Sequence, residues 1–422
     1  MFYYTRYWFE RAYYIMSDSF SEVTNQSWGS RIKQSSQGAL IGIILFFSAF
    51  YLLFWNEGRA VHRAQTLEEG ASIVYSIDSD MVDWVYDGKL VHLTGETSTD
   101  EILKDVMFGI TAAHKIKLRR LVEMYQWDEI IHSETEEMLG GGTQTVTTYN
   151  YSKKWSSSLI DSSEFMQPQG HQNPSYMPVS GETMTAKRVN LGEFSLSPTL
   201  VDKLNNYQHL PITSEVFEQW QQKRRTQLYD KNLHFHYGNY YVGHNPAYPQ
   251  IGDFQIKFEV VRPAMISVVA KQVSSRLTPY MTEAGGEIEL FEYGAVTPGE
   301  MFKRAQRANT ILTWILRLLG FLMMSIGLGF IFQVLKTLAA VIPILGNLVG
   351  VIGGFIILVL AFILSLVTIA IAWIYYRPLL GILLLVIAGA LLYLLKFSRK
   401  SAEPMTQESP RLLPETDVPS KQ

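Results

Sequence analysis

Four long stretches of this chain carry no charged side chain, and they constrain its fold more than any other feature. They are residues 38–55, 318–335, 348–373 and 379–395. A helix of about 20 apolar residues crosses the hydrocarbon core of a bilayer. A single stretch of this kind is compatible with a buried core helix, but four of them, three close together near the C-terminus, are typical of transmembrane helices. We therefore predict an integral membrane protein with four transmembrane helices.

The polar parts of the chain complete the predicted architecture. We expect an α+β membrane protein in which one large β-rich extramembrane domain is inserted between transmembrane helices 1 and 2. Its predicted parts are an N-terminal cytoplasmic segment (1–37), transmembrane helix 1 (38–55), the lumenal or periplasmic β-rich domain (56–310), transmembrane helices 2–4 (311–395) and a cytoplasmic polar tail (396–422).

Basic residues decide the predicted orientation. Cytoplasmic flanks of membrane helices are enriched in lysine and arginine. Both predicted cytoplasmic flanks are basic, and the short turn after the third stretch carries only Arg377. Lys303, Arg304 and Arg307 favour the opposite orientation, but long translocated domains are largely exempt from this rule. Both termini are therefore predicted on the cytoplasmic side.

The first fifteen residues, MFYYTRYWFERAYYI, are unusually aromatic. Tyrosine and tryptophan favour the headgroup region, so the segment is compatible with an interfacial anchor. The alternative is that Met16 is the true start. The pattern does not predict a cleavable signal peptide, because the first apolar stretch begins too late and lacks a small-residue cleavage site.

Alternating apolar and polar residues predict strands through most of the 56–310 block. GGG at 140–142 separates two β-rich runs, 121–131 and 143–155, which predicts a hairpin. Two segments are expected to be helical, 214–228 and 298–310, the second with Thr297 as N-cap and Glu300 as its reciprocal partner. The remaining predicted strands are 89–96, 250–261, 265–273 and 286–294.

The stretch KLRRLVEMYQWDE (117–129) combines cations, acids and aromatic residues. In a strand, Val122 and Met124 point to one face and Glu123, Tyr125 and Trp127 to the other. The cations at 117, 119 and 120 are expected before the strand proper, either at its solvated entry or as partners of nearby acids. A nucleic-acid surface is not predicted, because the chain has a net charge of −3 and its domain is not basic.

Several unusual strings resemble the LUMA family, also called transmembrane protein forty-three, of the endoplasmic reticulum and inner nuclear membrane, together with its bacterial relatives. The resemblance runs from about residue 38 to 395. It rests on NEGRA (56–60), KLVHLTG (89–95), KLRRLVEMYQW (117–127), GHQNPS (170–175), NPAYPQIGD (245–253) and YYRPL (375–379). The resemblance implies four transmembrane helices with a large lumenal domain between the first and second. It also implies a role in organising the nuclear inner membrane and its protein complexes.

Catalytic and metal-binding signatures are absent from the sequence. There is no cysteine, which excludes disulfides, thiolate metal sites and thiol nucleophiles. No nucleophile elbow, phosphate-binding loop or zinc-protease motif is present. His234 and His236 share a face if they lie in a strand, but they lack a nearby third ligand. The sequence therefore predicts a non-enzyme without metal or cofactor, and Asn-Pro turns in GHQNPS and GHNPAYP.

Glycines repeat every four residues in the first apolar stretch, at Gly38 and Gly42, and on entering the third, at Gly346, Gly350 and Gly354. Small residues at this spacing let helices approach closely, either within one subunit or between subunits. The stretches contain no Asp, Glu, Lys, Arg or His, which argues against a proton-coupled pump.

Polar and aromatic residues mark the expected membrane boundary. Asn56, Glu57 and Arg59 follow the first stretch and are predicted to fix the angle of the domain on the membrane. Between the third and fourth stretches, an interfacial turn is predicted, with Pro378 starting the fourth helix. Its remaining members are Tyr375, Tyr376 and Arg377.

We predict a non-enzymatic multi-pass membrane scaffold that self-associates and organises membrane or envelope protein complexes. The alternatives are an oligomeric channel or transport accessory, which a polar path on an oligomer axis would favour, and a lipid-binding protein, which an apolar cavity at the bilayer surface would favour. The expected partners are the lipid bilayer, further copies of the chain and other membrane proteins, without nucleic acid. The expected location is a bacterial inner membrane with the domain periplasmic, or the endoplasmic reticulum or nuclear inner membrane with it lumenal.

Overall fold

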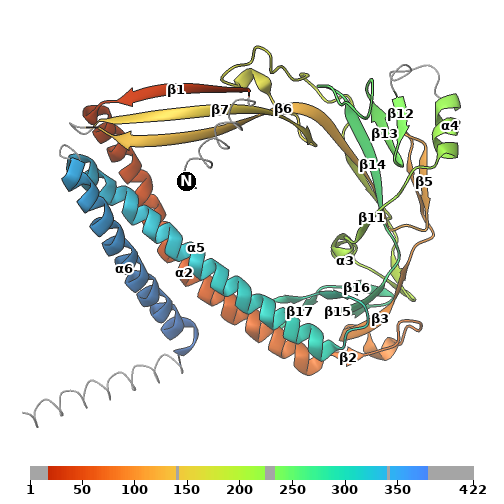
Figure 1. Cartoon of the computed structure of the whole chain (residues 1–422). Coiled ribbons are helices and arrows are strands. Elements are labelled where there is room, and N and C mark those ends of the chain that lie inside the picture. The colour runs from red at the N-terminus through yellow and green to blue at the C-terminus, as the bar shows by residue number, and fades with distance from the viewer. Residues whose placement is uncertain (1–17, 139–141, 224–232, 340–342, 379–422) are drawn as a thin grey trace, which may run out of the picture.

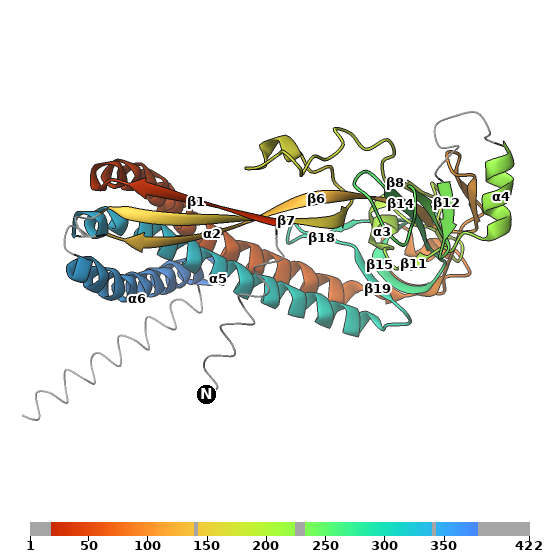
Figure 2. The ribbon, with the colours of Figure 1, turned by 45° about the horizontal axis from the view of Figure 1, so that its top comes forward.

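A computed structural model describes residues 18–138, 142–223, 233–339 and 343–378. Two long helices, α2 (Trp28–Ile73) and α5 (Pro298–Ala339), run side by side along one side of the molecule. Two β-sheets form the other sides (Figures 1 and 2). A third long helix, α6 (Pro343–Tyr376), packs against α2 and α5. The fold is α+β with a large β-rich domain.

Four shorter helical segments and nineteen strands complete the described elements. The helical ones are η1 (Trp84–Tyr86), η2 (Ser162–Glu164), α3 (Pro198–Lys203) and α4 (Ser214–Lys223). The strands are β1 (Asp18–Gln26), β2 (Tyr75–Ser76), β3 (Leu90–Ser98), β4 (Ile102–Asp105), β5 (Ile110–Ala113), β6 (Lys117–Glu137), β7 (Thr143–Ser156), β8 (Glu182–Thr185), β9 (Asn190–Leu191), β10 (Phe194–Ser195), β11 (Tyr207–His209), β12 (Leu233–His236), β13 (Asn239–Val242), β14 (Phe254–Val261), β15 (Met265–Val273), β16 (Arg276–Thr278), β17 (Tyr280–Met281), β18 (Glu287–Ile288) and β19 (Leu290–Tyr293).

The larger sheet follows the order β1-β7-β6-β14-β13-β12, with β8 beside β6 and β11 beside β14. In the second sheet, β15 pairs with β3, β16 and β19. The main core lies between the two sheets and includes Val122, Ile256 and Phe258 of the first and Leu93 and Val268 of the second. Burial on one face explains the alternation seen in the sequence, because successive side chains of a strand point to opposite faces.

Two smaller cores connect the helices to the domain and to one another. Leu67 of α2 and Phe302 of α5 are buried against Leu90, Val269 and Ile288 of the sheets. Farther along the same helices, a separate cluster joins Leu53 of α2, Met324 of α5 and Ala361 of α6. The same two helices thus bury one half against the domain and the other half in a helical bundle.

The predicted hairpin around GGG is confirmed. β6 and β7 pair antiparallel, with Tyr125 opposite Trp155 and Glu137 opposite Thr143. Val122 and Met124 are buried, whereas Glu123, Tyr125 and Trp127 lie on the more open face, as the alternation predicts.

The prediction that the KLRR cations precede the strand at a solvated entry was wrong. All three lie inside β6, and Lys117 and Arg120 are buried. Arg120 forms an ion pair with the buried carboxylate of Asp105, and it also contacts Glu182 at 3.1 Å. Arg119 pairs with Glu259 on the neighbouring strand. Arg119 and Arg120 are thus partners of acids, which was the alternative interpretation, and this pairing offsets the cost of burying their charges.

The helices are longer than predicted. α2 continues for eighteen residues beyond the apolar stretch that ends at Trp55, so NEGRA lies within the helix rather than after it. The predicted helix 298–310 and the second apolar stretch form the single helix α5. Thr297 accepts a hydrogen bond from the Glu300 amide at 3.4 Å as expected, but the Glu300 carboxylate contacts Arg304 instead of capping back.

Three described helices are long and apolar enough to cross a membrane, within Gly29–Ile73, Pro298–Val334 and Gly353–Tyr376. Many large apolar side chains on their outer faces are exposed, including Phe47 at 65% and Phe355 at 70%. Exposed faces of this kind suit contact with lipid. The predicted fourth helix, 379–395, and the tail lie outside the described residues, so a four-helix arrangement stays a prediction.

The N-terminal segment contributes a strand that the sequence analysis did not predict. Residues 18–26 form β1, which pairs along its whole length with β7. β1, β7 and the distal part of β6 form a three-stranded ribbon, defined here as residues 18–26, 125–137 and 143–156. Residues 18–26 are therefore part of the β-rich domain's larger sheet; the side of a bilayer on which they lie stays a prediction.

The ribbon extends from the domain to the far end of the helices (Figure 1). At its tip, Gln26, Thr135 and Thr143 line a small cavity together with Gly38 of α2 and Phe330 of α5. At its other end, the same β6 strand pairs with β14 in the domain. The ribbon therefore meets α2 at the start of its apolar stretch, and the two diverge toward the domain (Figure 1).

Candidate functional site

A buried polar network lies where α2, α5 and α6 leave their apolar stretches. It contains the predicted boundary residues Asn56 and Glu57, which are 0% and 3% exposed, together with the half-buried Arg59. Fully buried polar groups are expensive unless they are paired. Each of these three residues makes hydrogen bonds to α5, so the network joins the two longest helices at the edge of their apolar regions.

Glu57 is the centre of the network. Its carboxylate accepts two hydrogen bonds from Arg317 of α5, at 2.7 Å from Nε and 2.8 Å from Nη2. It also accepts one from the indole Nε1 of Trp373 on α6, at 2.8 Å. The Arg317 guanidinium lies 4.7 Å from the ring centre of Trp314 and 5.8 Å from that of Trp373. One carboxylate thus holds all three helices together, and the bidentate geometry fixes their relative height.

Asn56 and Arg59 form the second half of the network. The Asn56 amide donates to the backbone oxygen of Thr313 at 3.1 Å. Arg59 donates to the side-chain oxygens of Asn56, Asn309 and Thr313, the last two at 2.9 and 3.0 Å. Asn309 in turn donates to the Ala60 oxygen at 2.9 Å. The spacing 56, 59, 60 places these α2 groups on the one helix face that meets α5.

Aromatic side chains from the end of α6 pack on α2 next to the network. Phe54 contacts Tyr375 and Tyr376, with ring centres 5.6 and 5.2 Å apart. Gly58 lies directly under the Tyr376 ring, and a Cβ built there would be 2.5 Å from the ring. Arg377 is exposed at the end of the helix, next to Pro378. The aromatic residues therefore pack on α2, beside the polar network.

Gly58→Ala should destabilise the protein by about 1–3 kcal/mol, because the added methyl group displaces the Tyr376 ring from its contacts. Alanine is the better helix former, so a loss of stability would report the contact and not the helix. Gly299→Ala is the matched control, since nothing lies within 4 Å of a Cβ there. Thermal unfolding in detergent compares the two; equal midpoints would contradict the proposed contact.

The network opens to one side as a groove of about 270 Å³. Ala60 and Ala64 of α2 leave room beside Thr310 of α5, and Trp314, Trp373 and Arg377 also line it. The groove therefore combines arginines, indole rings and small side chains at the edge of the apolar stretches.

The predicted small-residue positions fall in different surroundings. Gly42 packs against α5 of the same chain, where a Cβ would meet the Gly327 oxygen and the Phe330 Cβ, each at 2.7 Å. Gly38 and Gly354 have open space at the Cβ position. Gly346 and Gly350 belong to the helical backbone of α6, but their surroundings lie outside the described part of the structure.

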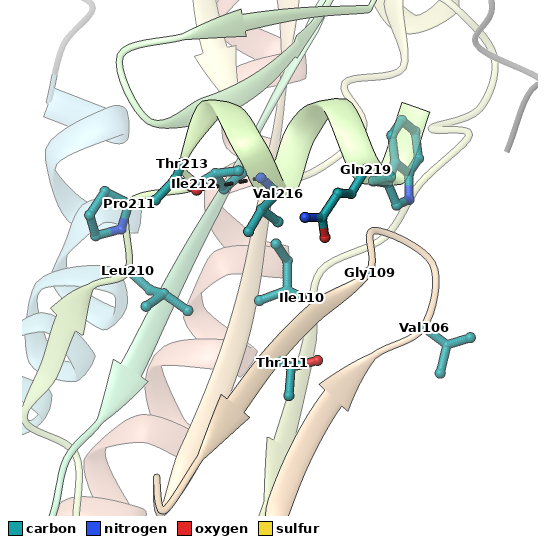
Figure 3. A pocket seen from close by; sticks show the side chains of 11 residues that line it. Val106, Gly109, Ile110, Thr111, Leu210, Pro211, Ile212, Thr213, Val216 and Gln219 are labelled. Carbon is teal, nitrogen blue, oxygen red and sulfur yellow. Dashed lines mark hydrogen bonds between the residues drawn. The ribbon is translucent and has the colours of Figure 1, made fainter. Parts of the chain in front are cut away.

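A second cavity lies in the β-rich domain, between the β4–β5 hairpin and α4 (Figure 3). It measures about 390 Å³ and is lined mainly by Val106, Ile110, Ile212, Val216 and Trp220. The Trp220 indole donates to the Met107 oxygen at 2.8 Å and stacks on Phe108. α4 lies at the end of the molecule far from the apolar halves of the helices (Figure 1). This cavity therefore lies far from the apolar halves of the helices.

GHQNPS forms a loop that holds the base of the ribbon. His171 is buried, stacks on Tyr151 at 3.8 Å and approaches Asp18 of β1 at 2.7 Å through Nε2. Tyr151 donates to Glu129 at 2.7 Å, and burial together with that carboxylate raises the pKa of the Tyr151 phenol to about 12. Asn173 bonds both backbone groups of Trp127. The loop is a structural brace that ties β1, β6 and β7 together.

The paired histidines contact aromatic rings. His234 lies opposite Tyr241 in the β12–β13 pair, and the His236 ring contacts Tyr237 at 4.3 Å. Among the residues that the structure describes, no three potential metal ligands come together.

Sequence reasoning identified the α2 side of the network and the residues at the end of α6, but not the α5 side. It did not single out Asn309, Thr313 or Arg317. The positions of the apolar stretches could have identified Arg317. The apolar stretch of α5 begins at residue 318, and that of α2 ends at residue 55. In two antiparallel helices these ends lie at the same height, which places the charge at 317 beside the charge at 57.

The chain was compared with known proteins. It matches the family described as Transmembrane protein 43 over residues 124–378. It is 35% identical to Transmembrane protein 43 of Rattus norvegicus over 84% of this chain and 88% of that protein. It is 34% identical to Transmembrane protein 43 of Homo sapiens, with the same coverage, and 32% identical to the homolog of Drosophila melanogaster, over 83% and 92% of the two chains. No solved structure matches the chain significantly.

Proposed function

The chain belongs to the transmembrane protein 43 family and is an integral membrane protein, and we propose that it is a non-enzymatic scaffold that self-associates and presents its β-rich domain to other membrane proteins. The proposal rests on two parts of the structure, the connection between the helices and the domain and the ribbon that reaches the far end of the apolar helices. The proposed location is the endoplasmic reticulum or nuclear inner membrane with the domain lumenal, or a bacterial inner membrane with it periplasmic.

The connection between domain and helices supports a platform role. α2 and α5 pass without interruption from the helical bundle to the domain, where Leu67 and Phe302 are buried. The Glu57–Arg317 pair and the Asn309–Ala60 hydrogen bond join them midway. A continuous helix pair transmits its orientation better than a flexible linker does. The domain is thereby held at a defined angle to the helices.

The position of the ribbon is the main observation in support of self-association. Its tip meets α2 at Gly38, where the apolar stretch begins, and the ribbon carries Asp128, Glu129, Glu134 and Glu136 between this tip and the domain. The outer edges of β1 and distal β6 have no partner strand in the described residues. Unpaired backbone groups and carboxylates are not tolerated in contact with hydrocarbon. If α2 spans the bilayer, further protein or a water-filled space must cover the ribbon. Neighbouring copies of the chain provide that cover in our proposal.

The glycine face of α6 is the proposed contact between the helices of neighbouring copies. Gly346, Gly350 and Gly354 follow one another at four-residue spacing, so they lie nearly on one helix face. Small residues allow close backbone approach and its dispersion contacts. The open space at Gly354 is consistent with a partner helix there.

Native mass spectrometry tests the proposed self-association. The wild-type chain in mild detergent should appear as an oligomer, and the double substitution Gly350→Leu with Gly354→Leu should shift it to monomer while the domain stays folded by circular dichroism. A wild-type monomer at all detergent and lipid conditions would contradict the proposal. An intact, stable oligomer of the double variant would remove α6 as its contact.

The ribbon also favours a second candidate function, an oligomeric channel or transport accessory. Hydroxyl pairs occur on both of its faces: Ser133 with Thr147 at 3.1 Å and Thr135 with Thr145 at 2.9 Å on one face, and Ser21 with Thr148 at 3.0 Å on the other. Non-helical backbone at membrane depth is tolerated where it lines water. Ribbons gathered around an oligomer axis would therefore form a polar path. Ion flux through liposomes containing the purified oligomer would separate this role from a closed scaffold.

A further inference from the structure

We propose that the groove between α2, α5 and α6 binds the phosphate of an anionic phospholipid headgroup, with the Arg377 guanidinium as its principal ligand. This proposal is independent of self-association, because every residue that it uses belongs to one copy of the chain. The argument rests on the position of the groove, its charge and the chemistry of its walls.

The groove lies at the height where lipid phosphates are found. On α2 it begins directly after the apolar stretch, at Glu57; on α5 it ends directly before the next apolar stretch, at Arg317; on α6 it follows the third stretch, at Arg377. All three helices therefore change from apolar to polar at the groove. The headgroup layer of a bilayer starts where its hydrocarbon core ends, so a helix bundle that spans the core places this groove at the phosphates.

The charges at the groove favour an anion. Arg317 and Arg377 line the groove together with a single carboxylate, that of Glu57. Glu57 is already occupied by Arg317 and Trp373. Arg59 bonds only uncharged oxygens in the described structure, among them those of Asn309 and Thr313 at the groove wall. The surplus positive charge is therefore not neutralised by the described residues of the protein.

Arg377 has the freedom and the geometry to bind the anion. Its side chain is exposed at the mouth of the groove, and it makes no ion pair with any residue in the described ranges. Its backbone amide donates to the Trp373 oxygen at 2.8 Å, which keeps it on the helix face that carries the Trp373 indole. A guanidinium binds a phosphate through two parallel hydrogen bonds, a geometry that an ammonium group cannot form.

The walls of the groove favour a lipid over free phosphate. Trp314, which is 63% exposed, and Trp373 both line it. Indole rings prefer the interface between headgroups and acyl chains, because one part of the ring is apolar and the N–H is polar. A free phosphate would leave these rings without an apolar partner, whereas the glycerol and upper acyl chain of a phospholipid would cover them.

The test is a titration of the delipidated full-length protein in detergent with dioctanoyl phosphatidylglycerol, followed by native mass spectrometry. Arg377→Gln should weaken binding roughly tenfold or more, since a charge-assisted hydrogen bond contributes about 1.5–3 kcal/mol. Arg377→Lys keeps the charge but loses the two-point geometry, so it should lie between wild type and Arg377→Gln. Arg262→Gln is the matched control, because it removes an exposed arginine of the β-rich domain and should leave binding unchanged.

Two outcomes would overturn the proposal. Equal lipid affinity for Arg377→Gln and Arg262→Gln would show that Arg377 does not bind the headgroup. Displacement of the lipid by inorganic phosphate at comparable concentration would show that the groove recognises a soluble phosphate and not a phospholipid. Neither outcome depends on the oligomeric state, so a negative lipid-binding result would not contradict the scaffold proposal. In the same way, a monomeric protein that binds the lipid would contradict self-association but not the lipid site.

Discussion

Glu57→Gln should lower the free energy of unfolding by about 3–5 kcal/mol, because it leaves the Arg317 guanidinium buried without its carboxylate. Arg317 is 15% exposed and Glu57 only 4% in their side chains, so solvent can compensate little of the loss. The substitution also weakens the acceptor of the Trp373 indole. The predicted effect is large because one group holds three helices.

Thermal unfolding in detergent, followed by tryptophan fluorescence, measures this effect. Glu193→Gln is the control for loss of a carboxylate, since Glu193 is exposed in the domain. The double variant Glu57→Gln with Arg317→Gln should recover part of the stability, because it removes the uncompensated charge. If Glu57→Gln unfolds at the same temperature as Glu193→Gln, the ion pair is not what joins the helices.

Local patterns in the sequence predicted those parts of the fold that local physics controls. The alternation at Val122 and Met124 reflects burial on one face of β6, and the strand 265–273 has the predicted boundaries. Apolar length alone indicated the three described membrane-type helices. In each case the signal lies within one segment, because a strand or a helix repeats its own period.

Features that depend on distant partners were missed. The cations of KLRR looked like a solvated strand entry because their acids, Asp105, Glu182 and Glu259, come from three other segments. β1 contains few apolar residues, and its pairing with β7 arises from backbone hydrogen bonds and from the His171–Asp18 contact. The sequence of one strand does not identify its partner strand, since many sequences are compatible with pairing at the same sheet edge.

The same limit applies to the candidate site. Asn56, Glu57 and Arg59 attracted notice because polar residues directly after an apolar stretch are unusual. Their partners on α5 are unremarkable in the sequence, where Asn309 and Thr313 resemble any polar helix positions. Only the antiparallel contact of α2 and α5 turns them into a network. NEGRA lies inside a continuous helix, whereas the sequence had suggested a position after it. The Glu57 variants can still test the expectation that NEGRA sets the angle of the domain.

Cysteines placed at Ser21 and Thr148 should form an internal disulfide in nearly every molecule when native membranes are treated with a mild oxidant. The two residues are paired across β1 and β7, and their side-chain oxygens lie 3.0 Å apart. A disulfide needs Cα atoms about 4.4–6.8 Å apart, which directly opposed residues in antiparallel strands satisfy. The chain has no native cysteine, so any disulfide within it must join the two introduced residues. Thiol labelling before and after reduction measures the yield.

The control combines Ser21→Cys with Thr145→Cys, which moves one partner three residues along β7, about 10 Å, beyond the reach of a disulfide. A bond in Ser21→Cys/Thr148→Cys but not in the control would establish the ribbon in the membrane. The acidic strands would then reach the far end of a spanning α2, and only neighbouring subunits or a water-filled path between them would keep lipid away. Free thiols in both variants would mean that β1 and β7 are apart in the membrane. That result would support the predicted topology, with residues 1–37 and 56–310 on opposite sides of the bilayer, and would remove the ribbon as the reason for self-association.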